Sequence, residues 1–377
     1  MANILYFSNG DSNDPSVWSN VPYCFAKALE QEGHTLFRVN LAPPRWISSL
    51  WNQTIYRVLR HFGHGHLYSS DRTLLASILR RLSIWKGNKE CPNADLSIFT
   101  GFDDLNYYSN KPSVLLCDWT LEYFITQRLK RKPYFLERCF ISRQNKVLKR
   151  ADTVISLFPK CSQIIEQQVP GLKVNYLGGN VLNIIDKEEL KENEILECKQ
   201  HSNVILFIGN IRYLSGAKKL IEAHRILRKS NPDLQLAIIG MTEDELGIKT
   251  DDNIRCYGYL HKNIVDENKT YYHLLRNAKI IVNTNDEWAG FSSMIEAMYY
   301  YTPVIVTPYS EFVETFGENI GFGVYDHIGT IMNLVLNIIH IMQDSDYCNK
   351  CKLSHKVTES YTWNHFVEQL LELTISS

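Results

Sequence analysis

The most constraining feature of this sequence is a regular alternation of short apolar segments with longer amphipathic ones. In the first half, helical patterns at 121–131, 134–150 and 160–168 follow apolar segments that predict strands. The predicted strands are Asn3–Ser8, Thr35–Leu41, Leu96–Thr100, Val114–Cys117, Thr153–Leu157 and Val174–Leu177. Strand and helix in series favour a parallel sheet with helices on both faces.

The alternation stops in a charged stretch, residues 186–202, and then begins again. Its second set of predicted strands is Val204–Ile208, Leu234–Ile239, Ile254–Tyr257, Ile280–Asn283 and Val304–Thr307, with a helix over 217–229. Because 377 residues exceed what one core usually serves, we expect two Rossmann-like domains. We expect the first over 1–183, completed by the last helix at about 360–377, and the second over 184–359.

The composition is that of a folded chain, with 45% apolar and 21% charged residues. The nine cysteines, an odd number, argue against a disulfide framework and for a reducing compartment. The first residues lack the basic region of a signal peptide, and no apolar run reaches the roughly 18 residues that span a bilayer. We therefore expect a cytoplasmic protein that at most contacts the inner face of a membrane.

Charge is distributed unevenly along the chain. Residues 33–89 carry nine Lys or Arg and one acid, and residues 128–150 have the same balance, so each block has a net charge of +8. Because the whole chain has a net charge of −1, the remaining residues carry −17. The basic blocks suggest a surface that meets phosphate or anionic lipid. No groove-reading motif accompanies them, so we expect no nucleic-acid partner.

Two strand-end loops in the first half carry candidate site residues. In the loop 8–20, Gly10 would let the backbone approach a ligand, and Trp18 stands at an otherwise exposed place. The alternative is a polar loop with a turn at Asp14-Pro15. Asp118 ends the candidate strand that begins at Val114, where a carboxylate would face a ligand, although it would equally cap the helix that begins near Leu121.

A third loop, residues 209–219, joins a strand to a helix in the second half. Arg212, Lys218 and Lys219 surround Ser215-Gly216 at the start of that helix. Cations beside a helix N-terminus favour phosphate binding, whereas lysines there oppose the helix dipole in a purely structural role. Solvation of an exposed surface is the alternative.

The segment DEWAGFSSMIEAMYYYTPVIV, residues 286–306, contains two glutamates on either side of a polar turn. The spacing of Ser293 and Glu296 fits a capping box, in which the serine caps the helix and the glutamate reaches back. From spacing alone, a structural role is the favoured interpretation.

Residues 46–62 have apolar side chains at helical spacing, interleaved with basic ones. Trp46, Trp51, Arg57 and Arg60 are the candidates here for contact with an acceptor or a membrane. The alternative is a helix packed on the first sheet.

The order of these loops resembles the retaining glycosyltransferases of family 4, which have the GT-B fold. The likeness rests on Glu296-Ala297-Met298 and Thr302-Pro303-Val304-Ile305 after NTNDEW, on NGD…WSN near the N-terminus, and on the strand start Ile205–Gly209. It covers most of the chain in order and is strongest from 204 to 324. The implied fold is α/β, with two Rossmann-like domains whose parallel sheets face across a cleft.

By this resemblance, Glu296 would bind the ribose of a nucleotide-sugar and Glu287 would contact the donor sugar as a catalytic group. Glu287 lies one position before the family's first glutamate, which aligns with Trp288. Asp118 falls near the histidine of the family's first domain and is the other catalytic candidate. The remaining implied donor-binding residues are Gly10, Asp11, Arg212, Lys218, Gly240, Tyr259, Leu260, Gly290, Phe291, Ser292 and Ser293.

The resemblance implies a retaining hexosyltransferase that needs no metal and no resident cofactor. Its co-substrate would be a UDP- or GDP-sugar, and its acceptor a glycan or a lipid-linked molecule, as in polysaccharide assembly. Two alternatives stay open: an inactive sugar-nucleotide-binding or partner subunit, and an epimerase or phosphorylase on the same fold.

Overall fold

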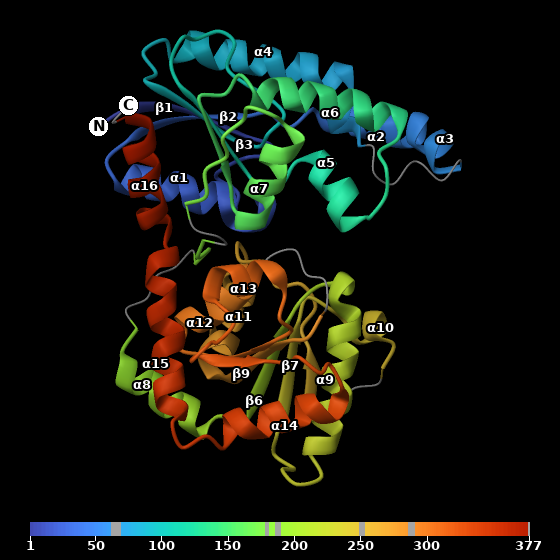
Figure 1. Ribbon diagram of the computed structural model, residues 1–377, viewed down its shortest axis with the longest axis vertical. Helices are drawn as coiled ribbons and strands as arrows, with labels where there is room; N and C mark the ends of the chain where they lie inside the picture. The colour runs from blue at the N-terminus through green and yellow to red at the C-terminus, as the bar shows by residue number, and fades with distance from the viewer. Residues whose placement is uncertain (62–68, 178–180, 185–189, 249–252, 286–290, 376–377) are drawn as a thin grey trace. The chain divides into compact units, whose positions relative to one another are not determined.

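A computed structural model describes residues 1–61, 69–177, 181–184, 190–248, 253–285 and 291–375. The chain divides into two compact units, each built on its own sheet (Figure 1). Unit 1 comprises residues 1–179 together with 363–377, and unit 2 comprises residues 180–362. The fold class is therefore α/β with two parallel sheets, as the sequence predicts.

Unit 1 contains a parallel sheet with the strand order β2-β1-β3-β4-β5. Its strands are β1 (Asn3–Ser8), β2 (Thr35–Asn40), β3 (Leu96–Thr100), β4 (Ser113–Cys117) and β5 (Thr153–Ser156). The strand order reverses between β1 and β3. In open parallel sheets, ligands bind at the carboxyl ends of the strands at such a switch point.

Helices of unit 1 lie on both faces of this sheet (Figure 1). They are α1 (Val21–Gln31), α2 (Arg45–Gln53), α3 (Ile55–His61), α4 (Leu74–Glu90), α5 (Leu121–Tyr123), α6 (Phe135–Leu148), α7 (Pro159–Gln168) and α16 (Trp363–Ile375). Helix α16 lies beside α1 (Figure 1), where the ring of Trp363 stacks on Phe25 with 5.0 Å between centroids. The edge of Phe366 meets the same Phe25 ring. The last helix of the chain thus belongs to the core of unit 1.

Unit 2 contains a second parallel sheet, with the order β11-β10-β9-β6-β7-β8. Its strands are β6 (Val204–Ile208), β7 (Gln235–Ile239), β8 (Ile254–Cys256), β9 (Ala278–Asn283), β10 (Val304–Val306) and β11 (Gly323–Tyr325). Here the switch point lies between β6 and β9, since the chain runs outward from these two neighbours in opposite directions.

Two apolar clusters cover the faces of the second sheet. One lies under α9 (Leu214–Leu227) and α14 (Ile331–Met342), and the other under α11 (Val265–Asn277) and α12 (Ser292–Tyr299). The other helices of unit 2 are α8 (Glu192–His201), α10 (Glu243–Leu246), α13 (Ser310–Phe316) and α15 (Tyr347–Thr358). A sheet buried on both faces explains why its strands are continuous apolar runs in the sequence.

The charged stretch 186–202 is not simply a connection, because it contains α8, which packs in unit 2. Its Lys199 is fully buried, and the Nζ atom donates to the carbonyl oxygens of Leu275 and Ala278 at 2.7 and 2.8 Å and to Thr302 Oγ1 at 2.6 Å. Burial lowers the pKa of Lys199 to about 7. The charged composition of this stretch therefore does not predict its helix. The buried lysine of that helix supplies hydrogen-bond donors to buried carbonyl oxygens.

Two other predicted elements differ from the structure. The single helix expected over 46–62 is divided into α2 and α3 at Thr54, whose φ of −115° and ψ of −92° are not helical. The strand expected at 174–177 is reduced to one bridge between Ile155 and Asn175. Within the described residues, every helix is too short or too polar to span a bilayer.

Candidate functional site

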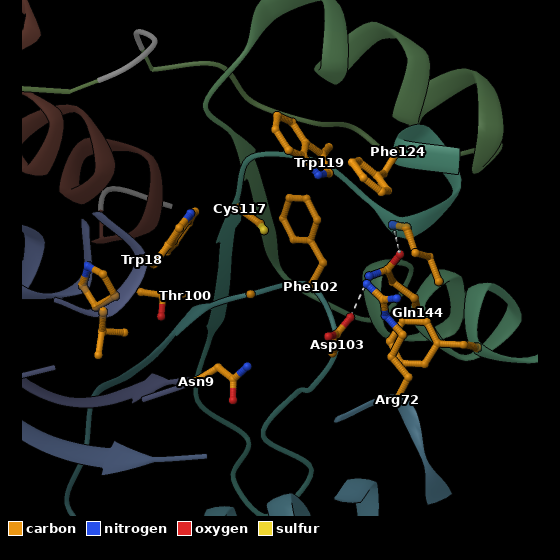
Figure 2. Close-up of a pocket in the computed structure, with 15 residues that line it drawn as sticks. Asn9, Trp18, Arg72, Thr100, Phe102, Asp103, Cys117, Trp119, Phe124 and Gln144 are labelled. Carbon is orange, nitrogen blue, oxygen red and sulfur yellow. Dashed lines mark hydrogen bonds between the residues drawn. The ribbon is translucent and has the colours of Figure 1, made fainter. Parts of the chain in front are cut away.

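A cavity of about 360 Å³ opens at the carboxyl ends of the strands in unit 1 (Figure 2). It lies at the switch point, since Asn9 follows β1 and Thr100–Asp103 follow from β3. Its lining residues are Asn9, Val17, Trp18, Pro22, Arg72, Thr100, Gly101, Phe102, Asp103, Cys117, Trp119, Leu121, Phe124, Phe140 and Gln144. Aromatic walls with a few oriented polar groups are typical of a site for a small polar ligand.

The structure brings together Trp18 and Asp118, two residues that the sequence analysis selects from separate loops. The indole Nε1 of Trp18 donates to Asp118 Oδ2 at 3.2 Å. Burial raises the pKa of Asp118 to about 6, and this hydrogen bond partly opposes the rise. A carboxylate with such a pKa is ionised near neutral pH and well suited to accept a proton there.

The backbone that carries Trp18 has an unusual conformation. Trp18, Ser19 and Asn20 have φ values of 41°, 51° and 69°, in the left-handed region that non-glycine residues rarely adopt. Each such residue costs on the order of 1–3 kcal/mol, and strain of this kind clusters at ligand sites. The strained loop places the Trp18 indole in the cavity wall (Figure 2), where its Nε1 also reaches Asp118.

Other polar groups of this cavity are absent from the sequence prediction. Gln144 Nε2 donates to Asp103 Oδ1 at 2.6 Å, and Gln144 Oε1 accepts from the Leu121 amide at 3.0 Å. Gln144 thereby orients the carboxylate of Asp103, which lines the cavity (Figure 2). The position of Asp103 just after β3 is the signal that would have found it, because Asp118 follows β4 in the same way.

Gly10 and Asp11 lie in the same loop as Trp18, although they are not among the described residues that line the cavity. Gly10 has a φ of 132°, and a Cβ there would lie 2.8 Å from Val17 Cγ1, so only glycine fits. Asp11 is exposed and closes a turn by accepting from the Asn13 amide at 2.9 Å. Both residues shape the loop that presents Trp18.

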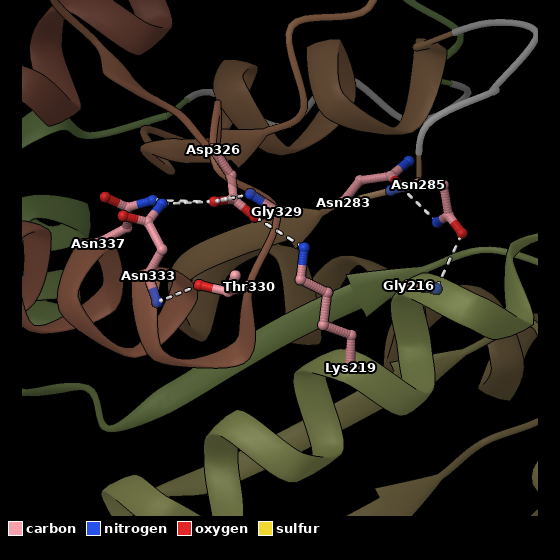
Figure 3. A network of polar contacts seen from close by, with 9 residues as sticks. All are labelled: Gly216, Lys219, Asn283, Asn285, Asp326, Gly329, Thr330, Asn333 and Asn337. Carbon is pink, nitrogen blue, oxygen red and sulfur yellow. Dashed lines mark hydrogen bonds and ion pairs between the residues drawn. The ribbon is translucent and has the colours of Figure 1, made fainter.

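In unit 2, the amide of Asn285 connects the two sides of the switch point (Figure 3). Asn285 Oδ1 accepts from the Gly216 amide at 2.9 Å and from Ser215 Oγ at 3.0 Å, and its Nδ2 donates to Asn283 Oδ1 at 2.7 Å. A Cβ at Gly216 would lie 2.4 Å from Asn285 Nδ2. The start of α9 is thus held against the end of β9.

Of the three cations in the loop 209–219, two are exposed to a ligand and one is not. Arg212 and Lys218 are exposed. The Lys219 ammonium instead pairs with the buried carboxylate of Asp326 at 2.9 Å, and Asn333 Nδ2 donates to the same side chain at 2.6 Å (Figure 3). Lys219 therefore holds α9 to the segment after β11 rather than standing beside Ser215-Gly216 as a phosphate ligand.

Three glycines lie next to each other at the carboxyl ends of β6, β7 and β8. The Gly240 amide donates to the Gly258 carbonyl oxygen at 2.6 Å, and a Cβ at Gly240 would lie 2.6 Å from the Gly209 carbonyl oxygen. Gly240 and Gly258 also have positive φ values of 98° and 63°. Tyr259, which follows, is 63% exposed, whereas Leu260 is partly buried. At this edge of the sheet the partly exposed backbone carries no side chains at the three glycines, so a ligand could approach it closely.

The capping-box interpretation of Glu296 is wrong. Helix α12 begins at Ser292, and no side chain caps its N-terminus. The buried Glu296 carboxylate accepts from Lys262 Nζ at 2.9 and 2.7 Å and from the Tyr271 hydroxyl at 2.6 Å. The glutamate points toward two distant segments rather than back to Ser293, because a long-range charged partner outweighs the local hydrogen bond.

Around α12, the predicted donor residues differ in accessibility. Phe291 is fully buried against Phe312 and Phe316, so its side chain serves the core. Ser292 and Ser293 are partly buried. Glu287 and Gly290 lie outside the described residues.

The residues predicted to contact an acceptor or membrane occupy α2 and α3. Trp51 packs against the cluster of Leu121, Ile125, Phe140 and Ile141, while Trp46 is 61% exposed. Arg57 and Arg60 are exposed on α3, which has no buried residue. The predicted amphipathic segment therefore packs on unit 1 through part of α2 and leaves α3 exposed.

Comparison with known proteins identifies the class of this fold. Residues 187–356, all within unit 2, match the family model described as glycosyl transferases group 1. No curated protein matches the chain in sequence. Two α/β units, each with a parallel sheet and its own switch point, are characteristic of the GT-B fold.

Solved structures agree with this fold over the whole chain. Sucrose-phosphate synthase from Thermosynechococcus elongatus has a TM-score of 0.67 at 14% identity, covering 100% of this chain and 99% of its own. Anabaena HepE, solved with UDP and glucose, has a TM-score of 0.62 at 15% identity, with 100% of both chains covered. The family match covers less than half of the chain, and at these identities the two solved structures show the fold.

A third structure is longer than this chain. A mutant of S. aureus TarM, solved with fondaparinux, α-GlcNAc-glycerol and UDP, has a TM-score of 0.52 at 15% identity and matches 74% of this chain. The match spans 55% of the TarM chain. At these identities the three likenesses concern the fold alone.

Proposed function

We propose that this chain is a retaining glycosyltransferase that moves a sugar from a nucleotide-sugar to a glycan or lipid-linked acceptor without a metal. The observation that carries the proposal is the family match over residues 187–356, which include the switch point of unit 2. The donor nucleotide is a UDP-sugar in this proposal, since HepE and TarM were both solved with UDP.

The donor would bind along the glycine edge and α12. Gly240, Tyr259 and Leu260 would meet the base, and Glu296 would accept the ribose hydroxyls. Arg212, just before α9, and Lys218, in its second turn, are both exposed and would neutralise the diphosphate together with backbone amides. As the glycosidic bond breaks, these groups would stabilise the charge on the leaving phosphate.

The acceptor would bind in the cavity of unit 1. Trp18 and Trp119 line it with apolar faces, and Asp103 lines it with a carboxylate that would accept hydroxyl hydrogen bonds. Asp118 is not a lining residue, but it accepts from the indole of Trp18, which is one, and would supply the second carboxylate. Because the pKa of Asp118 is about 6, this carboxylate is charged near neutral pH. Asp118 would then orient the acceptor hydroxyl and help remove its proton.

The proposal is tested by incubating the purified chain with UDP- and GDP-sugars and measuring nucleotide release with and without EDTA. We expect UDP release from at least one UDP-sugar, unchanged by EDTA, with retention of the anomeric configuration in the product. Binding of UDP without release from any sugar would instead support an inactive subunit. Release that depends on added inorganic phosphate would identify a phosphorylase.

A lipid-linked acceptor lies in a membrane, and α4 has an exposed apolar face that would contact one. Leu74, Ile78 and Leu82 are 71%, 56% and 54% exposed, on the side of the helix opposite the buried Ala76 and Ile84. Leu75 and Trp85 extend this exposed apolar face. Contiguous exposed apolar faces of this kind often mark an interaction surface.

Basic residues surround this face. Arg81, Lys86 and Lys89 are exposed on α4, and the Lys89 ammonium lies 3.9 Å from the centre of the Trp85 ring. The block 33–89 to which they belong has a net charge of +8. An apolar face with a basic rim is complementary to a membrane that contains anionic lipid, which is the occupant we propose.

Vesicle flotation tests this contact. We expect the chain to float with vesicles of phosphatidylcholine and phosphatidylserine at low salt, and the double variant Ile78→Glu, Leu82→Glu to remain in solution. The matched control is Met332→Glu with Leu336→Glu, which adds the same charge to exposed positions of α14 in unit 2. Equal flotation of the α4 variant and the control would exclude the membrane contact.

A further inference from the structure

Unit 2 contains a second cavity, of about 400 Å³, whose lining is rich in cations. It lies along one face of α11 and reaches Tyr300 at the end of α12. The lining residues are Lys262, Asn263, Val265, Asn268, Lys269, Tyr272, His273, Arg276 and Tyr300. Among these described residues there is no carboxylate.

The lining groups are donors suited to an oxyanion. Lys269 and His273 are exposed, and the guanidinium of Arg276 lies 5.8 Å from the Tyr300 ring centre. Asn268 is held in place because its Nδ2 donates to the Lys262 carbonyl oxygen at 2.7 Å. Two lysines and an arginine within one cavity raise the local positive potential, which favours phosphate or sulfate groups.

Lys262 connects this cavity to Glu296. An ammonium has three N–H donors, and those of Lys262 face Glu296 Oε1 at 2.9 Å, Glu296 Oε2 at 2.7 Å and the Asn183 carbonyl oxygen at 3.2 Å. An anion that accepts a hydrogen bond from Lys262 must therefore replace one of these three acceptors. Glu296 would keep the Tyr271 hydroxyl at 2.6 Å while one carboxylate oxygen becomes accessible.

We propose that this cavity binds a phosphate or sulfate group and that Lys262 couples its occupancy to nucleotide binding at Glu296. The coupling rests on the proposed function, in which Glu296 accepts ribose hydroxyls, whereas the anion site does not. Without the anion, Lys262 competes with ribose for the glutamate. With the anion bound, that competition is weaker, so each ligand increases affinity for the other.

Sulfate titration by calorimetry, against chloride at equal ionic strength, tests the site. We expect saturable sulfate binding, weakened about tenfold or more in the double variant Lys269→Ala, Arg276→Ala, which loses two charge-assisted contacts. The matched control is Arg225→Ala with Lys229→Ala, two basic residues in and after α9 that do not line the cavity. An equal loss in the control, or no saturable binding, would overturn the site.

Uridine tests the coupling, because it carries the ribose but no phosphate that would compete with sulfate. We expect sulfate to tighten uridine binding several-fold in the unmodified chain and to have no effect in the Lys269→Ala, Arg276→Ala variant. If sulfate does not change the affinity for uridine, the proposed coupling is wrong. If uridine does not bind while sulfate binding still depends on Lys269 and Arg276, the anion site stands and the proposed nucleotide site fails.

Discussion

Replacing Glu296 with glutamine is expected to lower the free energy of unfolding by about 3 kcal/mol and to abolish tight UDP binding. The substitution keeps the shape of the side chain but leaves the Lys262 ammonium, 11% exposed, without its counter-charge. The loss is larger than the ~1 kcal/mol that a helix cap would contribute. Denaturant unfolding gives the stability change, and calorimetric titration with UDP gives the affinity.

A control separates the charge from the hydrogen bonds. Tyr271→Phe removes one hydroxyl that donates to Glu296 but retains the ion pair with Lys262. We expect this variant to lose about 1–2 kcal/mol of stability and to retain most of the UDP affinity. If Glu296→Gln were no more destabilising than Tyr271→Phe, the buried charge pair would not be the source of the effect.

The second large effect is expected at Asp118. Replacing it with asparagine should reduce the transfer rate by about 10²- to 10⁴-fold, the range for loss of a proton-transfer group. The folded chain should nonetheless become slightly more stable near neutral pH. The rate is followed by nucleotide release in the presence of acceptor, and the stability by thermal unfolding at several pH values.

The sign of the stability change follows from the pKa. Burial raises the pKa of Asp118 to about 6 in the folded chain, above the value of about 3.9 expected when unfolded. Between these values the folded state binds more protons, so the contribution of this group is fully present below pH ~4 and is lost as the pH rises through 6. Asparagine is neutral and avoids that loss.

The pH profile distinguishes a catalytic role from a structural one. The rate of the unmodified chain should rise with pH through about 6 as Asp118 ionises. Trp18→Phe removes the indole donor that lowers this pKa, so its profile should move to higher pH. Full activity of Asp118→Asn would contradict a catalytic role for Asp118. Identical pH profiles for the unmodified chain and Trp18→Phe would also contradict it.

Much of the fold follows from local patterns in the sequence. The predicted strands Asn3–Ser8, Leu96–Thr100 and Val204–Ile208 have the same bounds in the structure, because a strand buried on both faces is a continuous apolar run. Residues 192–201 illustrate the limit. Their helix packs in unit 2 through a buried lysine, and the lysine's acceptors come from α11, β9 and Thr302, far along the chain.

The candidate site could be predicted only in part, for the same reason. Asp118 and Trp18 end or follow strands, so their loops could be recognised, but their hydrogen bond joins residues 100 positions apart. Glu296 has the local spacing of a capping box, while its partner Lys262 lies 34 positions away. Lys219 meets Asp326 at a separation of 107 residues. Spacing identifies which side chains stand at strand ends, and tertiary packing decides how they pair.

The stacking of Trp363 on Phe25 has a consequence for dividing this chain into fragments. Unit 2 is continuous in sequence, whereas unit 1 consists of two pieces that enclose it, so unit 2 is in topological terms an insertion. A fragment ending at residue 179 would expose the Phe25 ring that Trp363 and Phe366 cover. Proteolysis between the units would release an intact unit 2, while unit 1 would remain only as a noncovalent complex of two pieces, joined in part by these aromatic rings.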